Sequence, residues 1–322
     1  MSDLLNNFIY SVNVILPIFL LAFLGVFLKK IGLIGESFAA GADKLVFKVG
    51  LPTMLFLEIA RSSVSESLDP RLVLFVFLSV TGGFLGISGI ICLITPDNAK
   101  RGALIQGICR SNFAILGVPL IENMYGSAGL AEVALVMPVT ILLFNVYSVI
   151  VLSVFAPKEK QISAGKTALR ILRNIVTNPL IIGVVLGLPF MFFSWQLPVA
   201  ASKTLQYLSN LVTPVALISL GVSFRPEDLK GRLAYALGAS VAKTVGMPAL
   251  MVTIAALLGF RGVPLGIVLV LFGAPTAVSS YIMAKNMDSD HELAGQILLL
   301  TTMLCLFTIF LGIFILKSLN LI

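Results

Sequence analysis

The chain has 322 residues, of which 58% are hydrophobic and 11% charged, and its mean hydropathy is +1.05. Soluble globular domains carry about a quarter charged residues, so this composition excludes that class. Repeated apolar runs of about 20 residues match the bilayer core and predict an all-α polytopic membrane protein. The net charge of +7 does not indicate nucleic-acid binding, because Lys and Arg cluster in alternate short loops.

The apolar runs predict about ten transmembrane helices. The N-terminal residues MSDLLNNFIYSVN lack the basic region of a cleavable signal peptide, so we expect the first helix to be retained. In chain order the predicted helices cover approximately residues 8–28, 37–60, 71–94, 101–126, 130–155, 168–193, 202–222, 231–258, 261–287 and 291–316.

The distribution of basic residues predicts the orientation in the membrane. One set of alternate loops holds thirteen Lys and Arg residues and the other set holds five. The positive-inside rule therefore places the richer set in the cytoplasm and both termini outside. We expect a multi-pass protein of the cell (plasma or inner) membrane.

The polar segment 157–167, PKEKQISAGKT, divides the chain into two halves, 1–156 and 168–322. Each half has an odd number of predicted spans, so the halves insert with opposite orientation and form a 5+5 inverted repeat. Residue pairs that recur in register support this repeat: Arg101-Gly102 with Arg261-Gly262, Glu132 with Glu292, and Pro52 with Pro214.

Two of the predicted spans, 101–126 and 261–287, contain polar and helix-breaking residues in the middle of an apolar run. The first holds Arg110, Ser111, Asn112, Gly117 and Pro119, and the second holds Gly273, Pro275 and Thr276. Interrupted segments at corresponding places in two halves point to the binding site of a secondary transporter. Because free N–H groups at a helix start attract anions, paired breaks would bind a carboxylate. A simple proline kink is the alternative for each segment.

Uncharged polar side chains near the breaks are the candidate substrate ligands. Asn112 is the strongest, since an amide within the bilayer needs partners and can donate to a carboxylate, although a bond between helices would also satisfy it. Ser and Thr often bond back to their own helix, which weakens their case. Asn145 could serve either role. The predicted substrate-binding set is Ser111, Asn112, Asn145, Pro275, Thr276 and Ser279.

Charged residues within spans are costly and indicate function. The candidates for ion coupling or for supporting the site are Lys48, Arg110, Glu122 and Lys243. We expect Lys48 to pair with a carboxylate or with helix-end carbonyls, and Arg110 either to attract an anion or to anchor the break. Glu58 and Glu122 lie near predicted outer helix ends, where solvation would explain them equally well. Coupling to H⁺ or Na⁺ is open, and no cofactor is expected.

Other functional classes lack their sequence signals. The chain has one histidine, His291, and no Asp-rich pair, so we expect neither a metal site nor an intramembrane enzyme. Its three cysteines lie within apolar runs and are expected to be buried thiols. No Gly-rich lysine motif for nucleotide binding is present, which excludes primary pumping by this chain alone. A membrane sensor that binds a ligand or lipid without moving it is the alternative function.

The segment SNFAILGVPLIENMYG resembles the pattern P-N-T-x-x-x-G-x-P-L-x-x-x-M-Y-G of the plant PIN auxin carriers. Asn112, Gly117, Pro119, Leu120 and Met124 to Gly126 stand at matching places, and GAPTAVSSYIMAK is similar to the second crossing segment, with Pro275 at its proline. The chain thus resembles the auxin efflux carrier family, which joins bacterial malonate-type carriers with the PIN carriers.

This resemblance implies ten helices in scaffold and transport subdomains, an elevator-type movement, a homodimer, and a small organic anion bound where the broken helices cross. Glycine and proline alone place the first break at Gly117-Pro119, and the resemblance moves it towards Ser111-Asn112, level with Pro275-Thr276. Ser111 replaces the PIN proline, and the linker 157–167 is much shorter than the long loop of many PIN carriers. Both departures favour a bacterial-type carrier of small carboxylates.

Overall fold

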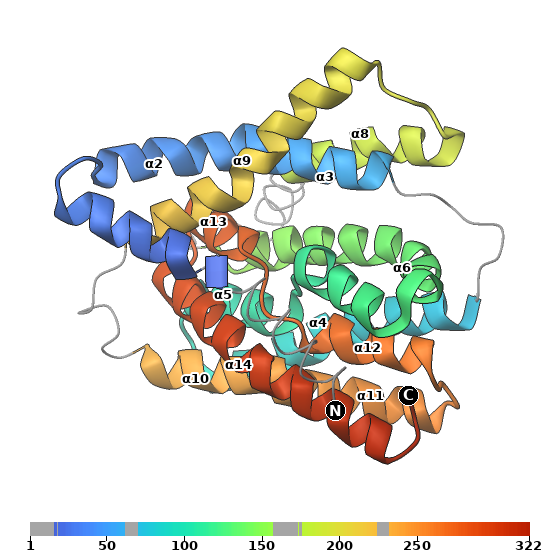
Figure 1. Ribbon diagram of the computed structural model, residues 1–322. Helices are drawn as coiled ribbons and strands as arrows, with labels where there is room; N and C mark the ends of the chain where they lie inside the picture. The colour runs from blue at the N-terminus through green and yellow to red at the C-terminus, as the bar shows by residue number, and fades with distance from the viewer. Residues whose placement is uncertain (1–15, 18, 62–69, 157–172, 174–175, 224–231) are drawn as a thin grey trace.

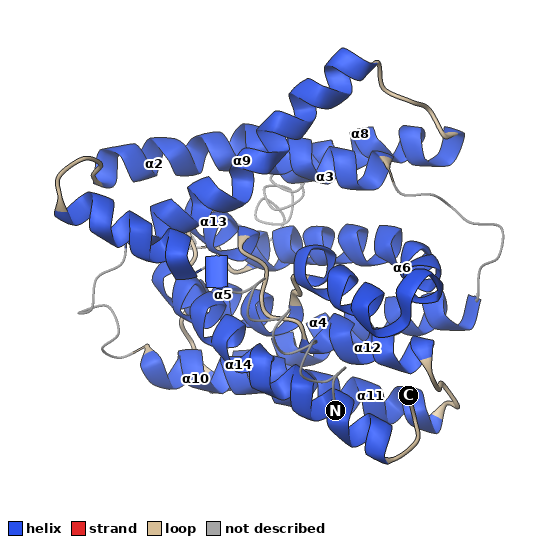
Figure 2. Ribbon diagram, in the orientation of Figure 1, coloured by secondary structure: helices blue, strands red, loops and turns tan. Residues whose placement is uncertain are grey.

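The computed structural model describes residues 16–17, 19–61, 70–156, 173, 176–223 and 232–322. Throughout these residues the regular elements are helices, without a strand, so the predicted all-α class is confirmed (Figure 2). The predicted linker 157–167 and the predicted starts of the first and sixth spans lie outside the described residues. The arrangement as ten helices in two inverted repeats remains a prediction.

Helical residues 19–30 precede a series of labelled elements. These are α2 (Glu36–Leu45), η1 (Val46–Gly50), α3 (Leu51–Ala60), α4 (Pro70–Ile94), α5 (Asn98–Cys109), η2 (Phe113–Gly117), α6 (Val118–Val154), α8 (Pro179–Phe193), α9 (Val199–Ser223), α10 (Leu233–Val241), η4 (Ala242–Gly246), α11 (Met247–Leu257), α12 (Val263–Gly273), α13 (Ser279–Asn286) and α14 (His291–Ser318). The η elements are single π-helical turns, which are often found at functional sites.

Several of these elements join into longer rods. The turn η1 connects α2 to α3, and η4 connects α10 to α11, without leaving the helical path. Helix α6 bends where Gly126 adopts φ 61°, close to the predicted boundary between two spans. Five segments are long and apolar enough to cross a membrane, namely 70–94, 128–154, 199–223, 233–257 and 291–318, and 179–193 and 263–273 are shorter apolar helices.

The helices form two layers (Figure 1). The smaller layer consists of α2, η1, α3, α8 and α9, which pack mainly on one another. The larger layer consists of α4, α5, η2, α6 and α10 to α14. The main contacts between the layers run through α6 and α13, which are the helices that follow the polar residues of the two interrupted segments.

Close packing in the smaller layer depends on small residues. Gly183 and Gly187 of α8 form a GxxxG pattern, and they lie against the backbone of Pro52 and the side chain of Ile59 in α3. A Cβ atom at Gly183 would collide with the carbonyl of Pro52. Such patterns allow two helices in lipid to approach until their backbones touch.

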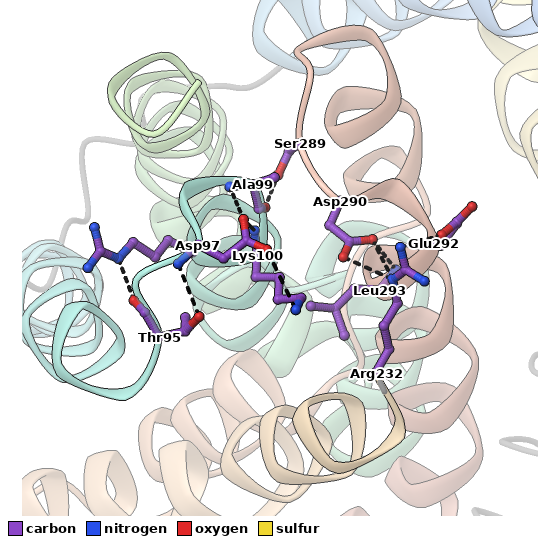
Figure 3. Close-up of polar contacts among 10 residues, drawn as sticks. Thr95, Asp97, Ala99, Lys100, Arg232, Ser289, Asp290, Glu292 and Leu293 are labelled. Atoms are coloured by element: carbon purple, nitrogen blue, oxygen red, sulfur yellow. Dashed lines mark hydrogen bonds and ion pairs between the residues drawn. The ribbon is translucent and has the colours of Figure 1, made fainter. Parts of the chain in front are cut away.

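Helix starts in the larger layer are linked by a polar network at one end (Figure 3). Asp97 caps α5 through the N–H of Ala99 at 3.0 Å, and Asp290 caps α14 through the N–H of Leu293 at 3.0 Å. Arg232 forms an ion pair with Asp290 at 3.0 Å, and Ser289 Oγ donates to the carbonyl of Ala99 at 2.7 Å. The network therefore fixes where α5 and α14 begin relative to each other.

We expect Gly183→Val to destabilise the protein by about 1–3 kcal/mol, the usual cost of overpacking, because the new side chain separates α3 from α8. The measurement is thermal unfolding of the purified protein in detergent. Gly82→Val in α4 is the matched control, since nothing lies within 4 Å of a Cβ at that glycine. Equal effects of the two substitutions would contradict the close packing at Gly183.

Candidate functional site between the two layers

Both interrupted segments leave the helical path in the structure. Helix α5 ends at Cys109, and the chain is non-helical through Asn112 before η2 begins. Helix α12 ends at Gly273, and α13 begins at Ser279. The position expected from glycine and proline alone, Gly117 to Pro119, is wrong, because Pro119 lies in the first turn of α6, where a missing N–H is tolerated.

The two interruptions are hydrogen-bonded to each other. The backbone N–H of Asn112 donates to the carbonyl of Pro275 at 2.8 Å. The hydroxyl of Thr276 donates to the carbonyl of Gly107 in the last turn of α5, and Gln106 Nε2 donates to the carbonyl of Ser280 at 2.9 Å. The first two bonds satisfy backbone groups near the ends of α5 and α12, and the third joins α5 to the first turn of α13.

A cavity of about 50 Å³ lies where the interruptions face the smaller layer. Polar side chains from the larger layer that line it are Arg110, Ser111, Asn112, Thr140, Asn145 and Ser279, and the smaller layer adds Glu58 and Thr213. Met54, Leu55, Phe113, Met137, Ile141, Phe144 and Val212 supply apolar walls. The cavity thus combines an apolar surface with a few converging polar groups, as small-molecule sites do.

Arg110 is 4% exposed, and its guanidinium is the central charged group of this cavity. Its Nη2 donates to Asn145 Oδ1 and to Ser279 Oγ, both at 2.8 Å, and its Nη1 donates to Met283 Sδ at 2.9 Å. Asn145 is itself fixed, because its Nδ2 donates to the carbonyl of Ile141 at 2.7 Å. Neutral groups therefore hold the cation in place without neutralising it.

Two buried hydrogen-bond donors at the cavity have no partner among the described residues, namely Arg110 Nε and Ser111 Oγ. The side chain of Asn112 lines the cavity beside them. Phe113 and Ala114, at the start of η2, also line the cavity, so the N-terminal end of that helix faces it. Buried donors without partners are costly, and an acceptor such as a carboxylate would satisfy them.

The structure brings Ser111, Asn112, Asn145, Ser279 and Arg110 together around one cavity. Of the remaining predicted ligands, Pro275 and Thr276 hold the two interruptions together and do not line the cavity. Their roles in binding remain predictions. Among the described residues, no group of three His, Cys, Asp or Glu side chains could hold a metal ion.

The other charged candidates lie away from this cavity. Glu122 is exposed on α6, and Lys243 is fully buried in η4, where its electrostatic neighbours are the thiols of Cys109 and Cys305. Lys48 is exposed on η1, and within the described part of the chain it forms no ion pair. The expected pairing of Lys48 remains a prediction.

Sequence reasoning missed one charged group on the smaller layer and left the role of another open. Asp43, on the buried face of α2, forms an ion pair with Lys285 of α13 at 2.6 Å and so joins the two layers. Glu58, for which solvation at a helix end and a functional role were both open, lines the cavity. A signal for Asp43 was present, since it is an acidic residue within a predicted span. Only the packing of α3 on α6 reveals the position of Glu58.

We expect Thr276→Val to destabilise the protein by about 1–3 kcal/mol, because it leaves the buried carbonyl of Gly107 without its hydroxyl donor. Thermal unfolding in detergent measures the effect. Thr308→Val is the matched control, since the Thr308 hydroxyl donates to the carbonyl of Leu304 in its own helix, at 3.2 Å. An unfolding temperature that falls no further for Thr276→Val than for the control would contradict this role.

Comparison with known proteins agrees with a membrane transport site. A family model described as "Membrane transport protein" matches residues 10–313. The chain is 27% identical to an "Uncharacterized transporter" of Methanothermobacter thermautotrophicus, over 93% of this chain and 96% of that protein. It is 26% identical to an uncharacterized transporter of Methanocaldococcus jannaschii, over 92% and 96% of the two chains. A "Putative malonate transporter" of Rhizobium meliloti is 25% identical, over 92% and 93%. The chain belongs to the membrane transport protein family of auxin efflux carriers, and it is a multi-pass membrane protein.

Proposed function

We propose that this protein is a secondary transporter of small organic anions, with malonate-like carboxylates as its substrate class. The observation that carries this proposal is the cavity between the layers, where the buried Arg110, the unsatisfied hydroxyl of Ser111 and the side chain of Asn112 converge. Arginine presents a fork of donors that matches a carboxylate, and charge-assisted bonds of this kind are strong. The relative named as a putative malonate transporter supports the same substrate class.

The division into layers suggests how the substrate would move. Each half of the chain contributes its earlier helices to the smaller layer and its later ones to the larger layer. This equal division supports a ten-helix inverted repeat in which the two interrupted helices cross. In this proposal the smaller layer is the scaffold and carries the homodimer contact, while the larger layer moves as an elevator with the substrate.

The size of the cavity supports a movement between the layers. A cavity of roughly 150 Å³ is known to hold benzene, so the present volume of about 50 Å³ is small for an organic acid. A second cavity of about 420 Å³ shares Met54, Glu58 and Thr213 with it and offers a route of entry. Separation of α3 and α9 from the larger layer would join the two spaces.

The direct test is uptake of labelled malonate and related acids into proteoliposomes, with imposed pH or sodium gradients. The proposed carrier accumulates an acid inside the vesicles and exchanges it across the membrane, with both termini on the outer side in cells. A membrane sensor would bind the acid without accumulation. Binding without any transport in sealed vesicles would therefore overturn the proposal.

We expect Asn112→Ala to reduce malonate binding by at least about tenfold, because a lost bond to a charged ligand costs roughly 1.5–3 kcal/mol. Arg110→Gln should abolish binding. Calorimetric titration of the purified protein measures both effects. Asn286→Ala is the matched control, since Asn286 Nδ2 bonds to Ile282 within its own helix, at 2.9 Å. Wild-type affinity in the Asn112 variant would remove this residue from the site.

A further inference from the structure

Glu58 stands at a distinctive place between the two cavities. It lies on α3 in the smaller layer, and it lines both the cavity of about 50 Å³ and the neighbouring cavity of about 420 Å³. In the smaller of these cavities it is the one carboxylate among the described lining residues, and Arg110 is the one cation. Any anion that reaches Arg110 through the larger cavity therefore passes Glu58.

The charges of Glu58 and Arg110 attract each other across the cavity. Other charged groups near α3 do not line the smaller cavity. Arg61 lines only the larger one and turns to Gln206 and Ser202 of α9. On the elements packed against α3, the charged residues Lys48, Lys203, Glu122 and Glu132 line neither cavity. Among the described residues that line the smaller cavity, Arg110 is thus the cation that faces Glu58.

Glu58 and Arg110 lie on different layers. In this respect Glu58 differs from Asn145 and Ser279, which accept hydrogen bonds from Arg110. Those neutral groups belong to the larger layer and stay with Arg110 in any rigid movement of that layer. Glu58 belongs to the smaller layer and would be left behind. A negatively charged substrate would therefore take the place of Glu58 beside Arg110, and it would travel with the guanidinium.

We propose that the Glu58 carboxylate competes with the substrate for Arg110, and that the substrate displaces it as Glu58 takes up a proton. This inference rests on the proposed function. In a small cavity of low dielectric, two carboxylates beside one guanidinium carry an excess negative charge, and such pairs retain a proton. The step is balanced: the substrate carboxylate binds Arg110, one proton from water adds to a Glu58 oxygen, and no covalent bond of the substrate changes.

The site thereby acquires a pH dependence that is separate from proton cotransport. Because the proton is bound to the stationary layer, it promotes binding without having to cross the membrane with the substrate. Linkage of one proton makes the affinity fall about tenfold for each pH unit over the range in which Glu58 must be protonated on binding. The sign follows from competition: raising the pH ionises Glu58, and the ionised carboxylate opposes the anion.

The test is calorimetric titration of the full-length protein in detergent with malonate, from neutral to mildly alkaline pH. Repetition in two buffers of different ionisation enthalpy counts the protons taken up. We expect the wild-type protein to take up about one proton per malonate and to lose affinity as the pH rises. Glu58→Gln should bind malonate at least as tightly as wild type, with no proton uptake and little dependence on pH.

Glu122→Gln is the matched control, because Glu122 is exposed on α6 and lines neither cavity; it should behave as wild type. Size-exclusion elution of each variant checks that it is folded. If wild type binds malonate and folded Glu58→Gln loses binding or keeps the pH dependence, competition by Glu58 is overturned while the proposed function stands. If folded wild type binds neither malonate nor acetate, the proposed function and this inference both fail.

Discussion

The structure depends on how two interrupted helices satisfy their backbone groups in a chain that is 58% hydrophobic. Unpaired N–H and C=O groups cost several kcal/mol in a hydrocarbon environment. The bond from the Asn112 N–H to the Pro275 carbonyl meets this constraint by pairing one interruption with the other. The side chains of Thr276 and Gln106 likewise donate hydrogen bonds to backbone carbonyls in the neighbouring turns. Each segment thus supplies hydrogen-bond partners for the backbone groups of the other. Neither segment could be interrupted alone without a comparable partner.

This junction also decides where charge can be placed. Arg110 lies two residues before Asn112, and its guanidinium is held by Asn145 and Ser279 rather than by an acid of its own layer. Asp43 and Lys285 show the contrasting arrangement, a direct ion pair of 2.6 Å between the layers. A buried charge is stable only when an opposite charge or hydrogen bonds compensate it. Because the groups that hold Arg110 are neutral, the opposite charge must come from groups that can leave the site.

The contacts between the two layers also fit the proposed movement of one layer against the other. Its main contacts come from α6 and α13, the helices that follow the interruptions. A direct ion pair holds one region of this interface, and a polar cavity occupies another. Packing within each layer is closer, as at Gly183 against Pro52. Rigid layers with a sparse, partly polar contact between them fit the proposed sliding of one layer along the other.

Composition and hydrophobic periodicity by themselves determined the all-α class, the membrane setting and the approximate limits of most described helices, because these properties are local and repeat along the chain. They also identified the two interrupted segments and most of the polar residues at the cavity. Local patterns placed the first break at Gly117 to Pro119, however, since proline reads as a helix breaker until its position in the first turn of α6 is known.

Only the tertiary structure decided which charged residues face the cavity. Lys48 and Asp43 belong to the same helical rod, yet Lys48 is exposed and Asp43 is paired with a residue more than two hundred positions away. Glu58 likewise meets Arg110 only because α3 packs against α6. The direction of a side chain in space depends on which helices surround it, and that arrangement is set by contacts between distant segments rather than by their own sequence.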